Sequence, residues 1–186
     1  MKYIDQTLVF ESDRIHYTEQ DTEFQVMMSW EDSIMKTSAD YVCEGGGDIL
    51  EIGFGMGISA GYIQANSITS HTIIENHPQV IEKAKAWAKD KPNVIIMEGS
   101  WYDVKNSLST YDGIFYDTWA DDNLKDFTSV LPSLIKPGAR VTWWNNFTDK
   151  DDFFNVEGTT YQALDIKPVE NTYFNNSAYY LPKKQF

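Results

Sequence analysis

A glycine-rich turn between a short apolar run and an amphipathic segment constrains the fold of this chain more than any other feature. The run DILEI at 48–52 leads into the turn GFGMG at 53–57, and ISAGYIQA at 58–65 leaves that turn with helical spacing. Small residues at such a turn let the backbone approach a nucleotide-sized ligand closely. The sequence therefore predicts a strand, a ligand-binding turn and a helix in succession.

The same alternation of strand and helix patterns continues along the chain. Further strands are predicted at 71–75, 93–97, 111–116 and 140–144, and helices at 78–89 and 124–135, the last followed by a KPGA turn at 136–139. Such alternation indicates βαβ units, and hence a Rossmann-like α/β fold with a mainly parallel sheet and helices on both faces. Segments 161–166 and 177–182 predict a closing antiparallel hairpin that could add a strand to the sheet.

The remaining segments complete a single predicted domain over residues 1–186. Apolar residues in 22–43 recur at about helical spacing and predict a helix over much of that stretch. We divide the chain into an N-terminal lid or helical segment at 1–44, a Rossmann-like core at 48–148 and a closing hairpin at 149–186. The Asn- and Asp-rich stretch at about 148–155 predicts a loop.

Composition narrows the partners of the chain. A formal net charge of −13 argues against nucleic-acid binding and suits a small cationic substrate, although acidity can also serve solubility alone. The single cysteine, Cys43, allows no intrachain disulfide, and one Cys with three scattered His makes a zinc site improbable. With no apolar run of about 20 residues and no signal-peptide pattern, we expect a cytoplasmic protein without a membrane span.

An acidic residue follows the glycines at an informative distance. Glu75 ends the second predicted strand about 20 residues beyond the turn, where a carboxylate can accept hydrogen bonds from both ribose hydroxyls of an adenosine. A solvated carboxylate at a strand end is the alternative. NAD and S-adenosylmethionine both satisfy these two features. The G-x-G-x-G run from Gly53, preceded by Glu51, resembles motif I of the class I methyltransferases, and no residue pair suggests hydride chemistry.

Five further segments make the resemblance more specific. They are VMMSWE at 26–31, LEIGFGMGISA at 50–60, HTIIE at 71–75, EGSW at 98–101 and YDGIFYDTW at 111–119. Together, and in order from about residue 24 to 148, they resemble the guanidinoacetate N-methyltransferase family and its fungal arginine N-methyltransferase relatives. The resemblance implies a methyltransferase that uses S-adenosylmethionine and releases S-adenosylhomocysteine.

By this resemblance, a set of residues contacts the cofactor, with Glu75 on the ribose and Ser100 and Trp101 beside the adenine. The set comprises Met27, Met35, Gly53, Phe54, Gly55, Met56, Gly57, Ser59, Glu75, Asn76, Ser100 and Trp101. Simple core packing is the alternative for the two lid methionines, Met27 and Met35, because methionine fills irregular apolar gaps readily.

The resemblance also implies that Glu31 and Asp117 grip the guanidinium group of a methyl acceptor. A planar guanidinium offers paired N–H donors that carboxylates accept bidentately. We assign Asp117 as the general base, with Glu31 as its orienting partner; the alternative is that both are surface acids. Asn145 and Asn146 are further candidates for acceptor contacts.

The tail departs from the family pattern. Residues 145–161 leave little room for the helix usual in the family, so the C-terminal part looks shortened, and a homodimer could cover the apolar surface exposed there. Two tryptophans, Trp143 and Trp144, stand in tandem. Because side chains alternate along a strand, the two tryptophans face opposite sides of the sheet. One of them faces away from the pocket. The second either reaches the pocket and stacks on a cation or packs in the core.

The sequence thus predicts an N-methyltransferase for a small guanidino or cationic amine compound. Two alternatives stay open. One is a methyltransferase for another acceptor, such as a protein arginine or a different amine, and the other is a non-catalytic protein that binds S-adenosylmethionine.

Overall fold

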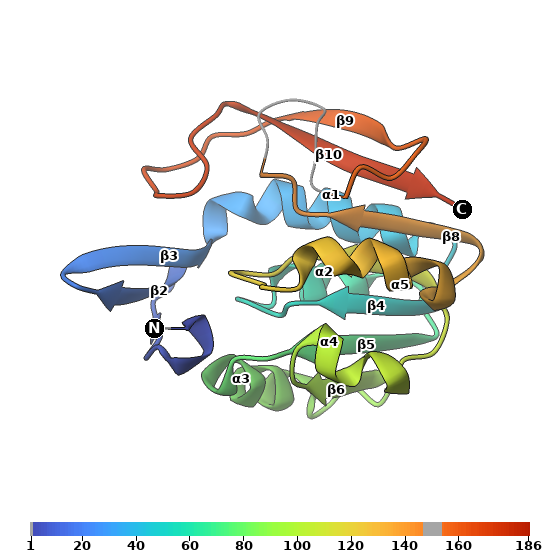
Figure 1. Ribbon diagram of the computed structural model, residues 1–186, viewed down its shortest axis with the longest axis horizontal. Helices are drawn as coiled ribbons and strands as arrows, with labels where there is room; N and C mark the ends of the chain where they lie inside the picture. Colours follow the sequence, from blue (N-terminus) through green and yellow to red (C-terminus); the bar gives the residue numbers. More distant parts are fainter. Residues whose placement is uncertain (1, 147–153) are drawn as a thin grey trace.

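A central sheet organises the protein, whose computed structural model describes residues 2–146 and 154–186 (Figure 1). Within these residues the sheet has seven strands in the order β6-β5-β4-β7-β8-β10-β9. Their bounds are β4 Asp48–Ile52, β5 Ser70–Glu75, β6 Val94–Glu98, β7 Tyr111–Tyr116, β8 Ile135–Trp143, β9 Thr160–Asp165 and β10 Ala178–Gln185. Strands β4 to β8 pair in parallel, whereas β10 is antiparallel to both β8 and β9. The predicted Rossmann-like α/β fold with a C-terminal antiparallel hairpin is confirmed.

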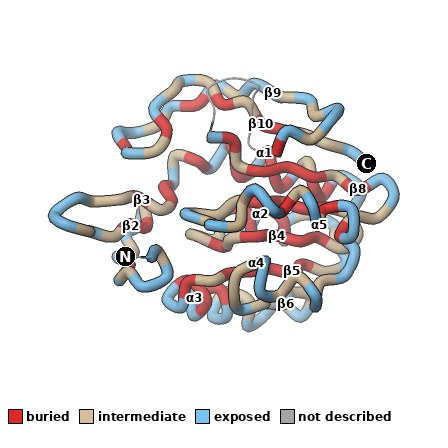
Figure 2. Tube along the Cα trace, viewed as in Figure 1, coloured by how far each residue is buried: buried red, intermediate tan, exposed pale blue. Residues whose placement is uncertain are grey.

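Helices cover both faces of the sheet, as βαβ crossovers require. They are α1 Asp32–Cys43, α2 Ile58–Ala65, α3 Pro78–Ala88, α4 Trp101–Val104 and α5 Phe127–Leu134. Alternation along β4 decides which side chain meets which layer: Ile49 packs with α1 and α2, and Leu50 packs with α4 and α5. Figure 2 shows the buried residues concentrated along the sheet strands and the helix faces turned toward them.

The N-terminal segment differs from the predicted helix over 22–43. Residues of the first part form β3, Thr22–Met28, which pairs with β2, Arg14–Glu19, and β2 pairs with the short β1, Val9–Phe10. The turn between β2 and β3 places Gln20 and Asp21 at φ 49° and 62°, as a tight hairpin turn requires. After the 3-10 turn Ser29–Glu31, α1 begins at Asp32. Strand pairing therefore overrides helical spacing over residues 22–28.

Smaller differences occur around α5 and β8. The predicted helix at 124–135 is a 3-10 turn, Leu124–Asp126, followed by α5. The predicted KPGA turn at 136–139 lies inside β8, where the register with β7 shifts and Gly138 has φ 86°. Because a glycine adopts this backbone without strain, the strand absorbs the irregular residues and continues. Most of the predicted loop at 148–155 lies outside the described residues.

Across residues 2–146 and 154–186, no helix is both long enough and apolar enough to span a membrane. The cytoplasmic location, the homodimer and the three-part division of the domain stay predictions.

Candidate functional site

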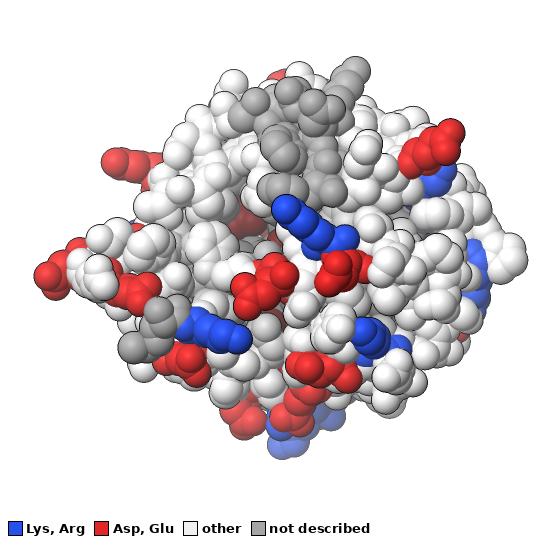
Figure 3. All heavy atoms as spheres, viewed as in Figure 1, with Lys and Arg blue, Asp and Glu red and all other residues white. Residues whose placement is uncertain are grey.

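A pocket of about 300 Å³ opens at the carboxyl ends of the parallel strands, which is where open α/β sheets bind ligands. It is lined by twelve of the residues predicted to contact cofactor or acceptor: Met27, Glu31, Gly53, Phe54, Gly55, Ser59, Glu75, Asn76, Ser100, Trp101, Asp117 and Asn146. Figure 3 shows the hollow from outside, with acidic side chains at its rim. The fold thus brings together residues that are up to 119 positions apart in the chain, from Met27 to Asn146.

Backbone hydrogen bonds fix the floor of the pocket beyond the ends of the strands. The N–H of Gly53 donates to Ile74 O at 2.8 Å, and the N–H of Asp117 donates to Ile52 O at 2.8 Å. Gly53 has φ 95°, and a Cβ at this position would lie 1.8 Å from the carbonyl oxygen of Asp117. Only glycine fits here, because the turn passes directly against the backbone that carries Asp117.

Met27 of β3 lies on the glycine turn. Its sulfur accepts a hydrogen bond from the N–H of Met56 at 3.1 Å, and a Cβ on Gly55 would lie 2.4 Å from the same sulfur. The N-terminal sheet therefore covers the turn. Tyr3 and Val26, from the same N-terminal segment, also line the pocket, and neither was identified from the sequence.

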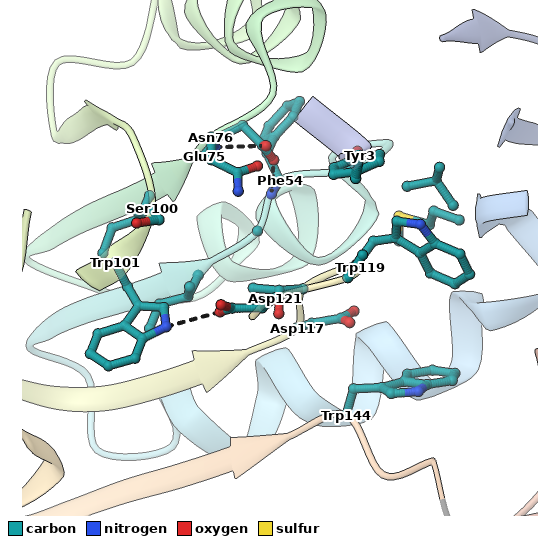
Figure 4. A pocket seen from close by; sticks show the side chains of 18 of the residues that line it. Tyr3, Phe54, Glu75, Asn76, Ser100, Trp101, Asp117, Trp119, Asp121 and Trp144 are labelled. Atoms are coloured by element: carbon teal, nitrogen blue, oxygen red, sulfur yellow. Dashed lines mark hydrogen bonds between the residues drawn. The ribbon is translucent and has the colours of Figure 1, made fainter. Parts of the chain in front are cut away.

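Glu75 is held rigidly at one end of the pocket (Figure 4). Its carboxylate accepts hydrogen bonds from the backbone N–H groups of Phe54, Asn76 and His77 at 2.8–2.9 Å. Burial raises the pKa of this carboxyl, and the backbone donors oppose that shift by stabilising the charged form. Glu75 is thus a fixed acceptor beside the glycine turn and not a solvated carboxylate at a strand end.

A buried polar cluster supports the turn from below. The Ser59 hydroxyl donates to the Glu51 carboxylate, and the His71 Nε2 lies 2.9 Å from the other oxygen of Glu51. Glu51 and His71 are fully buried. Only Ser59 of this cluster faces the pocket, so Glu51 and His71 position the start of α2.

The loop after β7 is fixed by Asp121, a residue that sequence reasoning missed. Its carboxylate accepts hydrogen bonds from Trp101 Nε1 at 2.9 Å, from the Tyr116 hydroxyl and from the N–H of Asn123 at 2.8 Å. Trp101 is buried against Phe127 of α5 while also lining the pocket (Figure 4). Asp121 therefore joins the segment that carries Trp101 to the loop that follows Asp117.

Glu31 and Asp117 lie at the other end of the pocket. Glu31 is only 4% exposed, and its Oε1 accepts hydrogen bonds from the N–H of Met28 at 2.8 Å and from the Tyr173 hydroxyl at 2.6 Å. Burial and then the charge of Asp117 raise the pKa of Glu31, while burial and then the charge of Glu51 raise the pKa of Asp117. A bound cation would favour the charged form of both acids, so this end of the pocket is suited to a positively charged ligand.

Aromatic rings wall the acid pair. Trp119, Trp144 and Tyr173 all line the pocket, and the Tyr173 ring centroid lies 5.9 Å from that of Trp119 and 6.2 Å from that of Trp144. Trp143, by contrast, packs against Phe154 in the core. Of the two tandem tryptophans, Trp144 is therefore the one that reaches the pocket. Trp119 is two residues from Asp117 and was detectable in sequence, whereas Tyr173 carried no signal.

Four predicted contact residues fall outside the pocket lining: Met35, Met56, Gly57 and Asn145. Met35 is fully buried in the core between α1 and the sheet. Asn145 is also buried, where its backbone N–H donates to the Tyr179 hydroxyl and its side-chain amide donates to Tyr180 O. Asn146 lines the pocket and accepts a hydrogen bond from Trp144 Nε1 at 2.6 Å. Of the two asparagines, the structure therefore presents Asn146 to the pocket.

Comparison with known proteins gives relatives in sequence. The guanidinoacetate N-methyltransferase family model matches residues 5–170. Protein arginine N-methyltransferase 2 of Candida glabrata is 33% identical over 195 residues, covering 87% of this chain and 47% of that protein. The protein of the same name from Aspergillus fumigatus is 41% identical over 154 residues, covering 77% of this chain and 35% of that protein. The chain thus spans less than half the length of these curated relatives.

Solved structures that resemble the fold are distant in sequence. The N-methyltransferase NodS from Bradyrhizobium japonicum superposes with a TM-score of 0.64 at 12% identity, covering 84% of this chain and 96% of that one. Spermidine synthase from Thermotoga maritima superposes with a TM-score of 0.63 at 11% identity, covering 96% of this chain and 72% of that one. At these identities the likeness shows the fold alone.

Proposed function

This chain belongs to the guanidinoacetate N-methyltransferase family, a family of S-adenosylmethionine-dependent methyltransferases, and we propose that it methylates a guanidinium nitrogen, with the side chain of arginine as the acceptor. The observation that carries the proposal is the acid pair of the buried Glu31 and the half-buried Asp117, which shares one pocket with the glycine turn and Glu75.

The residues at the turn fit S-adenosylmethionine. Gly53 and Gly55 adopt positive φ and add no side chain of their own to the pocket wall, and Glu75 lies beside them as a fixed acceptor for ribose hydroxyls. When bound, the cofactor supplies an electrophilic methyl group on a sulfonium sulfur. Gly53 also places this end of the pocket directly against Asp117, so the donor and acceptor ends are adjacent.

The acid pair supplies orientation and proton removal. Two carboxylates fix both the position and the plane of a guanidinium, so that the attacking nitrogen faces the methyl group in line. In the transfer, a nitrogen–carbon bond forms, the sulfur–carbon bond breaks and the nitrogen loses a proton. Asp117 accepts that proton because burial raises its pKa toward the range in which a carboxylate is an effective base. Glu31 stays the orienting partner.

The comparisons favour an arginine side chain over the small molecule that the sequence suggested first. Both curated relatives described above are named protein arginine N-methyltransferase 2. The side chains that line the pocket, among the described residues, include no lysine or arginine. A free acid such as guanidinoacetate carries a carboxylate, which would find no cationic partner among these lining side chains. An arginine within a peptide carries no such carboxylate.

Free guanidinoacetate remains the second candidate, because the matching family model carries its name. Both acceptors present the same guanidinium to Glu31 and Asp117, so the acid pair does not separate them.

A transfer assay with matched acceptors tests the proposal. The purified chain is given S-adenosylmethionine with an arginine-containing peptide, the same peptide with lysine in place of arginine, or guanidinoacetate, and products are identified by mass. We expect methylation of the arginine peptide and none of the lysine peptide, with loss of activity in Glu31→Gln. Transfer only to guanidinoacetate would select the second candidate. Cofactor binding without transfer to any guanidinium would show a binding protein and overturn the proposal.

A further inference from the structure

The acceptor end of the pocket contains a residue 142 positions beyond Glu31 in the chain. The Tyr173 hydroxyl donates to Glu31 Oε1 at 2.6 Å, and the N–H of Met28 donates to the same oxygen at 2.8 Å. These two donors occupy Oε1 and fix the plane of the carboxylate. Within the described part of the chain, no donor bonds Oε2, which leaves that oxygen to accept from a ligand.

The segment that carries Tyr173 is itself held in place. The Asn171 side chain accepts hydrogen bonds from the N–H groups of Tyr173 and Phe174 at 2.9 and 2.7 Å. Thr172 donates through both its N–H and its hydroxyl to Gln25 Oε1 of β3, at 3.0 and 2.8 Å. Asn171 and Gln25 are both buried. Tyr173 is therefore fixed by its own turn and by the N-terminal sheet, and its hydroxyl is preorganised for Glu31.

The ring of Tyr173 is packed as firmly as its hydroxyl. It stacks on Trp30, with the ring centroids 5.8 Å apart and the planes at 26°. Trp119 and Trp144 contact its other sides. Replacing only the hydroxyl would therefore leave these ring contacts in place, so the role of the hydrogen bond can be tested apart from that of the ring.

We propose that Tyr173 is a positioning residue of the acceptor site, which fixes the plane of the Glu31 carboxylate through Oε1 and so leaves Oε2 for the guanidinium. The inference rests on the proposed function, since it assigns to Tyr173 the orientation of the carboxylate that binds the acceptor. It also makes the segment 171–174, between β9 and β10, a functional part of the site.

The electrostatics around Glu31 give this role a measurable signature. Burial and the charge of Asp117 raise the pKa of Glu31, whereas the donors from Tyr173 and Met28 lower it. Burial and then the charge of Glu51 raise the pKa of Asp117. Burial and then the charge of Glu31 raise the pKa of the Tyr173 hydroxyl, so this hydroxyl remains a donor at neutral pH. Removing the Tyr173 donor should therefore raise the pKa of Glu31 further and delay its ionisation to higher pH.

The test compares Tyr173→Phe with the wild-type chain across pH, using the arginine peptide as acceptor. We expect KM for the peptide to rise about tenfold at pH 7, with a smaller change in kcat, because a hydrogen bond to a charged group is lost. The acid limb of kcat/KM should shift to higher pH. Binding of S-adenosylhomocysteine and the thermal midpoint should change little.

The matched control is Tyr41→Phe, which removes a hydroxyl from α1. Tyr41 lies ten residues after Glu31, which corresponds to about 15 Å along the helix axis. This control should leave KM and the pH profile unchanged. As a second variant, Thr172→Val weakens the link to Gln25 without altering the pocket lining, and should raise KM in the same direction by about two- to threefold.

Two outcomes would overturn the inference. One is an unchanged KM and acid limb in Tyr173→Phe while the wild type is active. The other is an equal loss at every pH, which would indicate a merely structural role. A double variant tests the coupling: adding Tyr173→Phe to Glu31→Gln should have little further effect on the Kd of the arginine peptide, measured by calorimetry with S-adenosylhomocysteine present, and additive losses would contradict the inference. A wild-type chain inactive on all guanidinium acceptors would instead overturn the proposed function.

Discussion

The two ends of the pocket are built in different ways. At the cofactor end, the glycine turn, its support Glu51 and the fixed acceptor Glu75 all come from one stretch of 25 residues, 51–75, and backbone groups make most of the contacts. At the acceptor end, Glu31, Asp117, Trp144 and Tyr173 come from four distant segments, and side chains make the contacts.

The difference has an energetic counterpart. Glu75 is buried, but three backbone donors compensate its charge. Glu31 and Asp117 are close enough that the charge of Asp117 raises the pKa of Glu31, so two negative charges at the acceptor end repel each other. The charge at the cofactor end is thus compensated by the protein itself, whereas the negative charges at the acceptor end are compensated when a cation binds. Functional sites commonly hold such destabilising groups.

Asp117→Asn should cause the largest loss of activity, and the loss should come from the acceptor end alone. The amide cannot accept the proton, so kcat/KM for the arginine peptide should fall about a thousandfold. Binding of S-adenosylhomocysteine, measured by calorimetry, should change less than about threefold if the two ends are independent. Near-normal activity in this variant would remove Asp117 from the role of base.

Gly53→Ala should break the cofactor end. The added Cβ would meet the carbonyl oxygen of Asp117 at 1.8 Å in a backbone with φ 95°. We expect a loss of about 3 kcal/mol in the free energy of unfolding, together with weak cofactor binding. The control is Gly61→Ala in α2, where a Cβ meets nothing within 4 Å; it should be neutral or slightly stabilising. Equal denaturation midpoints for the two variants would contradict the close approach.

Glu75→Gln should weaken cofactor binding by a smaller amount. The amide retains one oxygen but loses the charge. Its NH2 group would face a backbone N–H that now donates to the carboxylate, so one hydrogen bond is lost. The Kd for S-adenosylhomocysteine should rise about tenfold. Acceptor KM at saturating cofactor should stay nearly constant, and a large change in it would show that the two ends are coupled.

The smallest effect is a pH dependence of stability. Because the pKa of Glu31 is raised in the folded state, folding favours its protonated form, and this contribution is present at low pH and is lost as pH rises through the raised pKa. In the absence of ligand, Glu31→Gln should therefore gain about 1 kcal/mol in the free energy of unfolding relative to wild type between pH 5 and pH 8. Denaturant unfolding at both pH values measures this gain. A constant difference would contradict the unfavourable acid pair.

Two differences between the sequence-based predictions and the structure show where tertiary contacts override local pattern. The apolar residues of β3 have helical spacing, yet pairing with β2 makes them a strand. Met35 fits the family motif, yet the packing of α1 on the sheet buries it away from the pocket. In both places the amino-acid sequence was compatible with more than one local structure, and long-range contacts decided which structure formed.

The sequence by itself determined the α/β fold, the glycine turn and the place of Glu75, because each depends on residues that are neighbours in the chain. It also singled out Glu31 and Asp117 through motifs that precede and follow the turn. Only the tertiary structure decided that Trp144 faces the pocket, that Asn145 does not, and that Tyr173 bonds Glu31. Those outcomes depend on how β10 and the segment before it pack against β8 and the N-terminal sheet, and such long-range packing leaves no periodic signal in sequence.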